Sequence, residues 1–448
     1  MQQLSEQYAA SVPRYTSYPT APHFHAGVTK ETYRDWLGSV PAESGISLYI
    51  HVPSCDRLCW FCACHTKQIL RYGPLSRYLE ALYKEIEVVG SLLGPGVRVG
   101  AVHFGGGSPT MLKPEDIVKL DRKLRAAFHY LPDVEISVEI DPNDMEDARF
   151  DALAQIGMTR VSLGVQDFDP KVQQAINRVQ SFEQTKAVVD GARLRGVASV
   201  SLDLLYGLPH QTSESVEETM RQALALRPDR IALFGYAHVP WMKKHQTMID
   251  EAVLPDTAQR FEQARRAGAL IVASGYEAIG LDHFARPEDS LATAKRSGAV
   301  RRNFQGYTVD QSDTLIGLGT SSIGKLPQGY VQNCTATGEY ERMVAEDSLA
   351  VVRGFALSDD DRIRAWVIER LMCDFSFSQA KMLARFGERA GPIISQAKLL
   401  AATDRAGQFE RRGDTFTVTE AGRPLVRLIA SKFDAYLEKG VARHSAAV

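Results

Sequence analysis

The chain has 448 residues, of which 44% are hydrophobic and 24% charged, and its formal net charge at pH 7 is −2. These ordinary globular values exclude a disordered chain and leave no overall charge that would attract a nucleic acid. The beginning of the chain lacks the basic and apolar regions of a signal peptide, and no run reaches the roughly 18 apolar residues of a membrane span. We therefore expect a cytoplasmic protein that binds neither nucleic acid nor membranes.

The first predicted element is an arm rather than a helix. The stretch PRYTSYPTAPHF, from Pro13 to Phe24, is rich in proline, tyrosine and threonine. Proline at this density favours an extended chain. We assign residues 1–43 to an N-terminal arm.

From residue 46 onward, short apolar runs alternate with amphipathic stretches. The expected strands are Ser47–Val52, Val99–Phe104, Val134–Ile140, Arg160–Leu163, Ser199–Leu204 and Arg230–Phe234. The clearest helices between them are Leu75–Leu92, Pro114–Phe128 and Phe182–Leu194. This alternation predicts parallel strands joined by right-handed crossovers. Six units are fewer than the eight of a closed barrel, so the pattern favours an α/β fold with a partial (β/α)6 barrel at residues 44–329.

Residues suited to binding or catalysis follow each expected strand. In chain order they are a cysteine cluster, Gly105–Gly107, Glu139 with Asp141, Gln166 with Asp167, Asp203, and Tyr236–His238. Active sites of (β/α) barrels are built at the carboxyl ends of the strands. We therefore expect these residues to share one face of the barrel.

The remainder of the chain predicts a smaller unit. Residues 330–358 look like a connector, and residues 359–448 are expected to form a mainly helical C-terminal domain, for which a winged-helix-like form is one option. Its expected elements are helices Asp360–Cys373, Phe377–Phe386 and Leu425–Leu437 and a hairpin at Gly407–Thr419.

Four of the six cysteines, Cys55, Cys59, Cys62 and Cys64, lie within ten residues. Such clustering in a reducing compartment indicates metal binding or redox chemistry rather than disulfides. Three thiolates with the spacing Cys55-x3-Cys59-x2-Cys62 could bind a [4Fe–4S] cluster and leave one iron open for a further ligand. A structural zinc site and free thiols are the alternatives, although zinc ribbons need a second pair of ligands that this loop lacks. The spacing also leaves Cys64 open as a fourth ligand.

Four other features are candidates for ligand binding. The glycines at 105–107 allow a backbone to approach a ligand closely, or they form only a tight turn. Glu139 could accept hydrogen bonds from an amine or a ribose, or it could be a solvated strand end. Asp203 is flanked by apolar residues, where a carboxylate needs a partner. Arg178 is a possible ligand contact or a solvated residue of a helix face.

The cysteine loop and its flanks, from Tyr49 to Cys64, resemble those of the oxygen-independent coproporphyrinogen III oxidases. These are radical S-adenosylmethionine (SAM) enzymes of heme biosynthesis. Further matching motifs are PRYTSYPT from Pro13, GGGSPT from Gly105, SVEIDP from Ser137, GVQD from Gly164, DLLYGLP from Asp203, YAH from Tyr236, DHFARP from Asp282 and RNFQGY from Arg302. They occur in order over most of the chain. Two small departures are Ser108, where the family often has threonine, and Ala63, where glycine is common.

The resemblance implies a set of cofactor-binding residues. It implies that Cys55, Cys59 and Cys62 bind a [4Fe–4S] cluster and that Cys64 does not. It also implies two molecules of SAM. The cluster-bound SAM is expected to contact Tyr49, Gly106, Glu139, Ala237 and Ile323. The second SAM is expected to contact Phe61, Gly107, Ser108, Gln166, Arg178 and Asp203.

The implied reaction is oxidative decarboxylation of two propionate side chains of coproporphyrinogen III to vinyl groups, giving protoporphyrinogen IX. Breaking an unactivated C–H bond needs the cofactor, because no side chain is reactive enough. Implied partners are a low-potential donor such as a flavodoxin or ferredoxin and an unidentified electron acceptor, and we expect a monomer. Arg14, Arg286 and Arg302 are candidates for binding the four substrate carboxylates, beneath an arm that covers the barrel mouth.

Two alternatives remain open at this stage. One is a radical SAM relative that traffics or degrades heme, against which the arm and Cys64 argue. The other is a zinc-stabilised nucleic-acid-binding protein, for which the C-terminal segment is the best support. The residues that follow the strands argue against a pure binding module.

Overall fold

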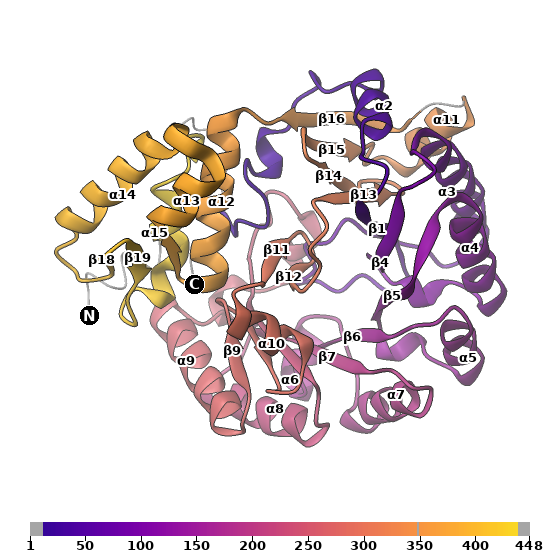
Figure 1. Ribbon diagram of the computed structural model, residues 1–448. Helices are drawn as coiled ribbons and strands as arrows, with labels where there is room; N and C mark the ends of the chain where they lie inside the picture. Colours follow the sequence, from indigo (N-terminus) through magenta and orange to yellow (C-terminus); the bar gives the residue numbers. More distant parts are fainter. Residues whose placement is uncertain (1–11, 347–348, 438–448) are drawn as a thin grey trace.

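The computed structural model describes residues 12–346 and 349–437, and a 12-stranded sheet dominates it (Figure 1). All six expected strands are present: β1 (Gly45–Val52), β4 (Arg98–Gly106), β5 (His129–Ile140), β6 (Arg160–Gln166), β7 (Ser199–Tyr206) and β8 (Arg230–Gly235). They lie side by side in chain order, each parallel to the next. The prediction of an α/β fold with six parallel barrel strands is confirmed.

Helices cover the outer, convex face of this curved sheet (Figure 1). They are α3 (Gly73–Leu92), α4 (Pro114–Ala127), α5 (Asp147–Gln155), α7 (Phe182–Leu194), α8 (Ser213–Ala225) and α9 (Thr257–Ala273). On β6, Val161, Leu163 and Val165 are buried in the main hydrophobic core. Each fully buried aliphatic side chain of this kind contributes about 1.5–3 kcal/mol to folding.

The other face of the same strands is polar. Side chains alternate along a strand, so the residues between the buried ones on β6 and β7 point away from that core. These include Ser162, Gln166 and Asp203, which are only half-buried. The alternation therefore places polar groups on the concave side of the sheet, where a ligand can reach them.

The sheet extends beyond the six expected strands at both edges. Strand β13 (Thr314–Leu318) lies next to β1 and is parallel to it. Three further strands follow in order, each antiparallel to the one before it: β14 (Ile323–Leu326), β15 (Gly329–Asn333) and β16 (Val351–Ala356). Next to β8 lie β10 (His283–Ala285) and β9 (Glu277–Ile279). The segment at 330–358, which we expected to be a connector, therefore contains two sheet strands and helix α11 (Thr337–Ala345). Its short strands β15 and β16 pair with each other, and β15 also pairs with β14. This pairing stabilises strands whose own sequences carry little signal, so they were not predicted.

The C-terminal region is mainly helical, as expected. It contains α12 (Asp359–Asp374), α13 (Gln379–Phe386), α14 (Gly391–Thr403), α15 (Val426–Ser431) and a small sheet of β17 (Ser376–Ser378), β19 (Thr415–Val418) and β18 (Phe409–Arg412). The sequence did not predict α14, because its Gly-Pro start resembles a helix breaker although proline is favourable in a first helical turn. The last helix is also shorter than the expected Leu425–Leu437. The boundaries of the domains remain predictions.

The N-terminal arm joins the barrel to the C-terminal region. Residues 12–24 are irregular except for the turn η1 (Ala21–His23), and helix α2 (Lys30–Gly38) then packs against α3 and β16. Tyr15 and Tyr18 are each only 3% exposed and belong to the core of the C-terminal region. The arm is therefore partly helical and partly a core element. Residues 1–11 and 438–448 of the expected arm and C-terminal domain lie outside the described residues.

None of the helices that the structure describes combines the length and the apolarity needed to cross a lipid bilayer.

Candidate active site

The predicted site residues gather at the carboxyl edge of the parallel strands. Tyr49, Gly106, Glu139, Gln166 and Asp203 lie on β1, β4, β5, β6 and β7, at or near their carboxyl ends. Ala237 follows β8, and Ile323 begins β14, which runs antiparallel to β13 and so starts at the same edge. The fold thus brings together residues that are up to 274 positions apart in the sequence.

Hydrogen bonds from distant segments fix the shape of the cysteine loop. The loop is closed by pairing of β2 (Ser54–Cys55) with β3 (Lys67–Gln68). His245 Nε2 lies 2.7 Å from the carbonyl oxygen of Cys62, and Gln246 donates to the carbonyl of Phe61 at 2.9 Å. Lys243 donates to the carbonyl of Cys64 at 2.8 Å. Because these bonds use main-chain oxygens, the thiols of the loop stay available for a ligand.

The three predicted cluster ligands lie near one another and are free thiols. Cys59 is buried, whereas Cys55 and Cys62 are half-buried and Cys64 is exposed. Burial raises the pKa of Cys55 to about 12. A hydrogen bond from Cys64 lowers the pKa of Cys62 to about 7, even though burial opposes this. Cys64 therefore contacts a predicted ligand, and its exclusion from the cluster remains a prediction.

These thiols fit an iron–sulfur cluster. Among the described residues, no group of three or more His, Cys, Asp or Glu side chains is arranged to hold a single metal ion. A [4Fe–4S] cluster takes one thiolate per iron, so its ligands stand farther apart than those of one ion. Three half-buried or buried thiols on one compact loop are a suitable donor set for such a cluster.

The glycine turn after β4 packs directly against the cysteine loop. A Cβ on Gly107 would lie 2.4 Å from Thr66 Oγ1 and 3.0 Å from Cys55 Sγ. Gly106 has a φ of +121° and would meet His51 at 2.8 Å. We predicted that these glycines permit close approach to a ligand. The structure shows that they permit close approach to the loop that carries the cysteines.

Glu139 lies beside this turn with one donor on each carboxylate oxygen. The amide of Gly106 donates to Oε2 at 3.0 Å, and His103 Nε2 lies 3.1 Å from Oε1. Burial raises the pKa of Glu139, but interaction with His103 outweighs it and the pKa falls below its ordinary value. The side chain is still 42% exposed. An ionised, oriented and accessible carboxylate of this kind can accept a hydrogen bond from a cationic ligand.

Arg178 is buried, which differs from the alternative that it is a solvated residue of a helix face. Its side chain is 8% exposed and forms an ion pair of 3.0 Å with Asp141. It also donates to the carbonyl of Gly164 at 2.6 Å and to Cys59 Sγ at 3.5 Å. Arg178 therefore links a predicted cluster ligand to the ends of two barrel strands.

Among the described residues, Asp203 has one hydrogen-bond partner, on the concave side of the sheet. Ser162 donates to its Oδ2 at 2.9 Å. Burial raises its pKa to about 6. Nearby, Gln166 has a φ of +68°, an uncommon conformation for a residue with a side chain.

The remaining predicted contacts differ in accessibility. Ser108 is buried and donates to Asp144 at 2.8 Å, so its hydroxyl is already engaged within the protein. Phe61, Ala237 and Ile323 are half-buried at the same edge of the sheet. Contact of each of these residues with SAM remains a prediction.

Sequence reasoning missed several groups at this site. His51 is buried, lies 3.0 Å from the Tyr49 hydroxyl and has its pKa lowered by burial to about 4, so it is neutral. His103 connects Ser137 with Glu139. The sequence did carry a signal for both histidines. His51 is two residues from Tyr49, and His103 is two residues from Gly105, so each histidine lies on the same face of its strand as a predicted site residue.

The three arginines proposed for substrate carboxylates separate in space. Arg14 and Arg302 line one cavity of about 720 Å³ at the end of β8. Arg286 does not line this cavity and instead lies over the ring of Tyr276.

Comparison with known proteins identifies the family. Residues 49–223 match the model of the radical SAM superfamily. The chain is 48% identical to the oxygen-independent coproporphyrinogen III oxidase of Bradyrhizobium diazoefficiens, over 98% of this chain and 97% of that one. It is 39% identical to the enzyme of that name from Escherichia coli, over 97% and 95% of the two chains.

A solved structure shows the same fold over the whole length. The structure of coproporphyrinogen III oxidase from Escherichia coli, described as a radical SAM enzyme, superposes with a TM-score of 0.91. It is 37% identical in sequence, and the match covers 96% of this chain and 100% of that one. Membership of the radical SAM superfamily implies a [4Fe–4S] cluster and SAM as cofactors. The chain belongs to the oxygen-independent coproporphyrinogen III oxidases, which are radical SAM enzymes of heme biosynthesis.

Proposed function

We propose that this enzyme converts two propionate side chains of coproporphyrinogen III to vinyl groups by oxidative decarboxylation, giving protoporphyrinogen IX. The observation that carries the proposal is the juxtaposition of the cysteine loop with Glu139, Gln166 and Asp203 on the concave side of the barrel. A (β/α) barrel with its functional groups at this edge is suited to enclosing a reactive intermediate.

The protein's contribution is to bind, orient and shield. The cluster and SAM, when bound, supply the radical that breaks the C–H bond. Cys55, Cys59 and Cys62 would bind the cluster, and the hydrogen-bonded carbonyls of their loop fix its orientation. Glu139, oriented by Gly106 and His103, would accept a hydrogen bond from the ammonium group of SAM.

We assign a second SAM to Gln166, Arg178 and Asp203, together with Phe61, Gly107 and Ser108. Arg178 is already paired with Asp141, so its role would be to position the neighbouring backbone rather than to bind SAM by itself. Asp203 keeps one carboxylate oxygen without a hydrogen bond from a described residue. It is therefore the best candidate for a direct contact.

Asp203→Asn is expected to weaken SAM binding by about 10–150-fold, since a hydrogen bond to a charged group contributes roughly 1.5–3 kcal/mol. Only the ionised carboxylate offers both oxygens as acceptors, and the pKa of Asp203 is about 6. SAM affinity of the unaltered enzyme should thus fall as the pH drops through 6. The fall should be smaller in Asp203→Asn, where only groups such as Asp144, the partner of Ser108 with a pKa of about 6, still titrate in this range. Anaerobic equilibrium dialysis with labelled SAM at several pH values measures both effects. If the unaltered enzyme and Asp203→Asn bound SAM with equal affinity at pH 8, Asp203 would serve only to hydrogen-bond Ser162 within the sheet.

An anaerobic assay tests the reaction itself. The cluster-loaded enzyme, given coproporphyrinogen III, SAM and a chemical reductant, should release two CO2 per protoporphyrinogen IX formed. A flavodoxin or ferredoxin would be the natural donor in this proposal. Heme trafficking or degradation is not favoured, because relatives that match 97% or more of this chain are named coproporphyrinogen III oxidases. Absence of decarboxylation together with tight heme binding would revive that alternative.

A further inference from the structure

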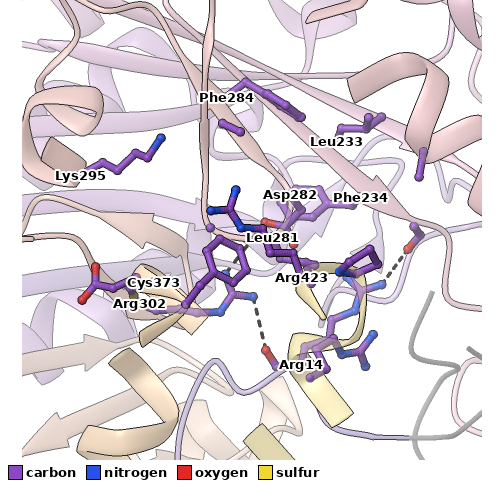
Figure 2. Close-up of a pocket in the computed structure, with 18 of the residues that line it drawn as sticks. Arg14, Leu233, Phe234, Leu281, Asp282, Phe284, Lys295, Arg302, Cys373 and Arg423 are labelled. Carbon is purple, nitrogen blue, oxygen red and sulfur yellow. Dashed lines mark hydrogen bonds and ion pairs between the residues drawn. The ribbon is translucent and has the colours of Figure 1, made fainter. Parts of the chain in front are cut away.

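The cavity at the end of β8 is strongly cationic. Its volume of about 720 Å³ is within the roughly 300–1,000 Å³ of small-molecule sites. Among the described residues that line it, lysine and arginine outnumber aspartate by nine to two, and glutamate is absent. Figure 2 shows Arg14, Arg302 and Arg423 on one side of the cavity, with Leu233 and Phe284 on the other. A cavity with a cationic side and an apolar side suits a large apolar ligand that carries anionic groups.

Arg302 has hydrogen-bonding capacity that the protein does not use. Its side chain is 4% exposed, and neither Nε nor Nη1 has a hydrogen-bond acceptor among the residues that the structure describes. Its closest carboxylate oxygen, Oδ1 of Asp282, is 4.0 Å away, and its Nη2 donates to the carbonyl of Arg14 at 3.3 Å. A buried donor without an acceptor lowers the stability of the fold by about 1–3 kcal/mol, and by more when the donor is charged. This guanidinium is therefore suited to donate hydrogen bonds to an acceptor on a ligand.

Three other arginines, from different parts of the chain, surround the same space. Arg260 donates to the carbonyl of Tyr236 at 2.7 Å, and within the described part of the chain its Nε has no acceptor. Arg14 donates to the carbonyl of Gly235 at 2.7 Å, and Arg427 donates to the arm at Pro13. Burial and the charge of Arg14 lower the pKa of Arg427 to about 10. The acceptors of Arg14 and Arg260 are neutral backbone carbonyls, so their positive charges remain concentrated beside that of Arg302 around one cavity.

The cavity borders the proposed reaction site. Phe234, Gly235 and Tyr236 line it and directly precede Ala237, a predicted SAM contact. Asp282 also lines the cavity. Its neighbour His283 contacts the ring of Phe234 edge-to-face and lies close enough to Asp203 to affect the pKa of that carboxylate. A tetrapyrrole in this cavity would therefore extend toward the concave side of the barrel.

We propose that the arginines of this cavity, Arg302 foremost, bind the two propionates of the substrate that the reaction leaves intact. The inference rests on the proposed function. After hydrogen abstraction, the carboxylate of a reacting propionate leaves as neutral CO2, and one electron passes to the electron acceptor. An arginine that stabilises the negatively charged carboxylate would raise the barrier to this step. A propionate that is retained gains affinity from the same contact at no cost to the chemistry. The arginine cavity is therefore suited to the unreactive half of the macrocycle.

Three stable porphyrins separate the two kinds of propionate. Coproporphyrin III carries all four, mesoporphyrin IX carries only the two that correspond to the retained ones, and coproporphyrin III tetramethyl ester carries no carboxylate. With cluster-loaded enzyme, Arg302→Gln should weaken binding of coproporphyrin and of mesoporphyrin by a similar factor of about 10–150, the value of one charged hydrogen bond. The affinity for the tetramethyl ester should differ by less than threefold between Arg302→Gln and the unaltered enzyme. Equilibrium dialysis measures all three.

Matched variants guard against a general loss of structure. Arg260→Gln should reproduce the effect, whereas Arg265→Gln should not, because Arg265 lines the same cavity but is 57% exposed and paired with Glu262. Iron content and melting temperature report whether each variant is folded. If both Arg302→Gln and Arg260→Gln left mesoporphyrin affinity unchanged, or weakened coproporphyrin alone, the assignment to retained propionates would be overturned. Failure of the proposed function is distinct, because the unaltered enzyme would then not decarboxylate coproporphyrinogen III.

Discussion

Replacing Cys59 with alanine is expected to abolish cluster binding and all activity. Cys59 is the most buried of the three predicted ligands and the one that Arg178 contacts. A cubane that already lacks a fourth cysteine ligand has only two thiolates left after the substitution. Iron content should fall from about four per chain to near zero, by the stoichiometry of such clusters.

The other cysteines provide the controls. Cys55→Ala and Cys62→Ala should behave like Cys59→Ala, whereas Cys64→Ala should retain the iron. Cys373→Ala removes a buried thiol from a separate core and should also retain it. Iron and sulfide analysis of anaerobic preparations gives the comparison. Loss of iron in Cys64→Ala, with retention in any of the first three, would reassign the ligands.

Replacing Arg178 with methionine is expected to destabilise the protein by about 3–5 kcal/mol, because it leaves the buried carboxylate of Asp141 without its counter-charge. Asp141 is 12% exposed, so water compensates little. The double variant Arg178→Met, Asp141→Asn should recover part of the loss, since it no longer contains a buried unpaired charge. Denaturant unfolding of the three proteins measures the free energies.

A surface ion pair supplies the comparison. Lys186 pairs with Asp190 on α7, where both side chains are more than half exposed. Lys186→Met should change the free energy of unfolding by less than about 1 kcal/mol. A loss of the same small size in Arg178→Met would mean that the Arg178–Asp141 pair is not essential to the structure.

Arg178→Met should also lower the reduction potential of the cluster, because it removes a positive charge beside Cys59.

The parts of the fold that the sequence predicted well are local ones. Buried apolar residues alternate with half-buried residues along β6 and along β7 as far as Leu204. Such periodicity identifies an element wherever it sits in the fold. The strands β13–β16 have no comparable signal, because their pairing with β1 and with one another supplies their stability.

The candidate site likewise has features that local sequence predicts and features that depend on long-range contacts. The cysteine spacing and the residues after each strand could be read from the sequence, since parallel strands necessarily bring their carboxyl ends to one edge. The burial of Arg178 could not, because it depends on Asp141, which follows β5, and on Gly164 of β6. The hydrogen bonds from residues 243–246 to the cysteine loop also join segments more than 170 positions apart.

The sequence by itself determined the order of barrel units and the chemistry of the cysteine loop, because both depend on residues close together in the chain. Only the tertiary structure decided which arginines line the cavity at the end of β8. Arg14 and Arg302 are 288 positions apart and meet through one hydrogen bond. Among the described residues, Arg286 follows β10 but is turned toward Tyr276 and away from the cavity. The burial of a charge depends on what packs around it, and that is a property of the folded chain alone.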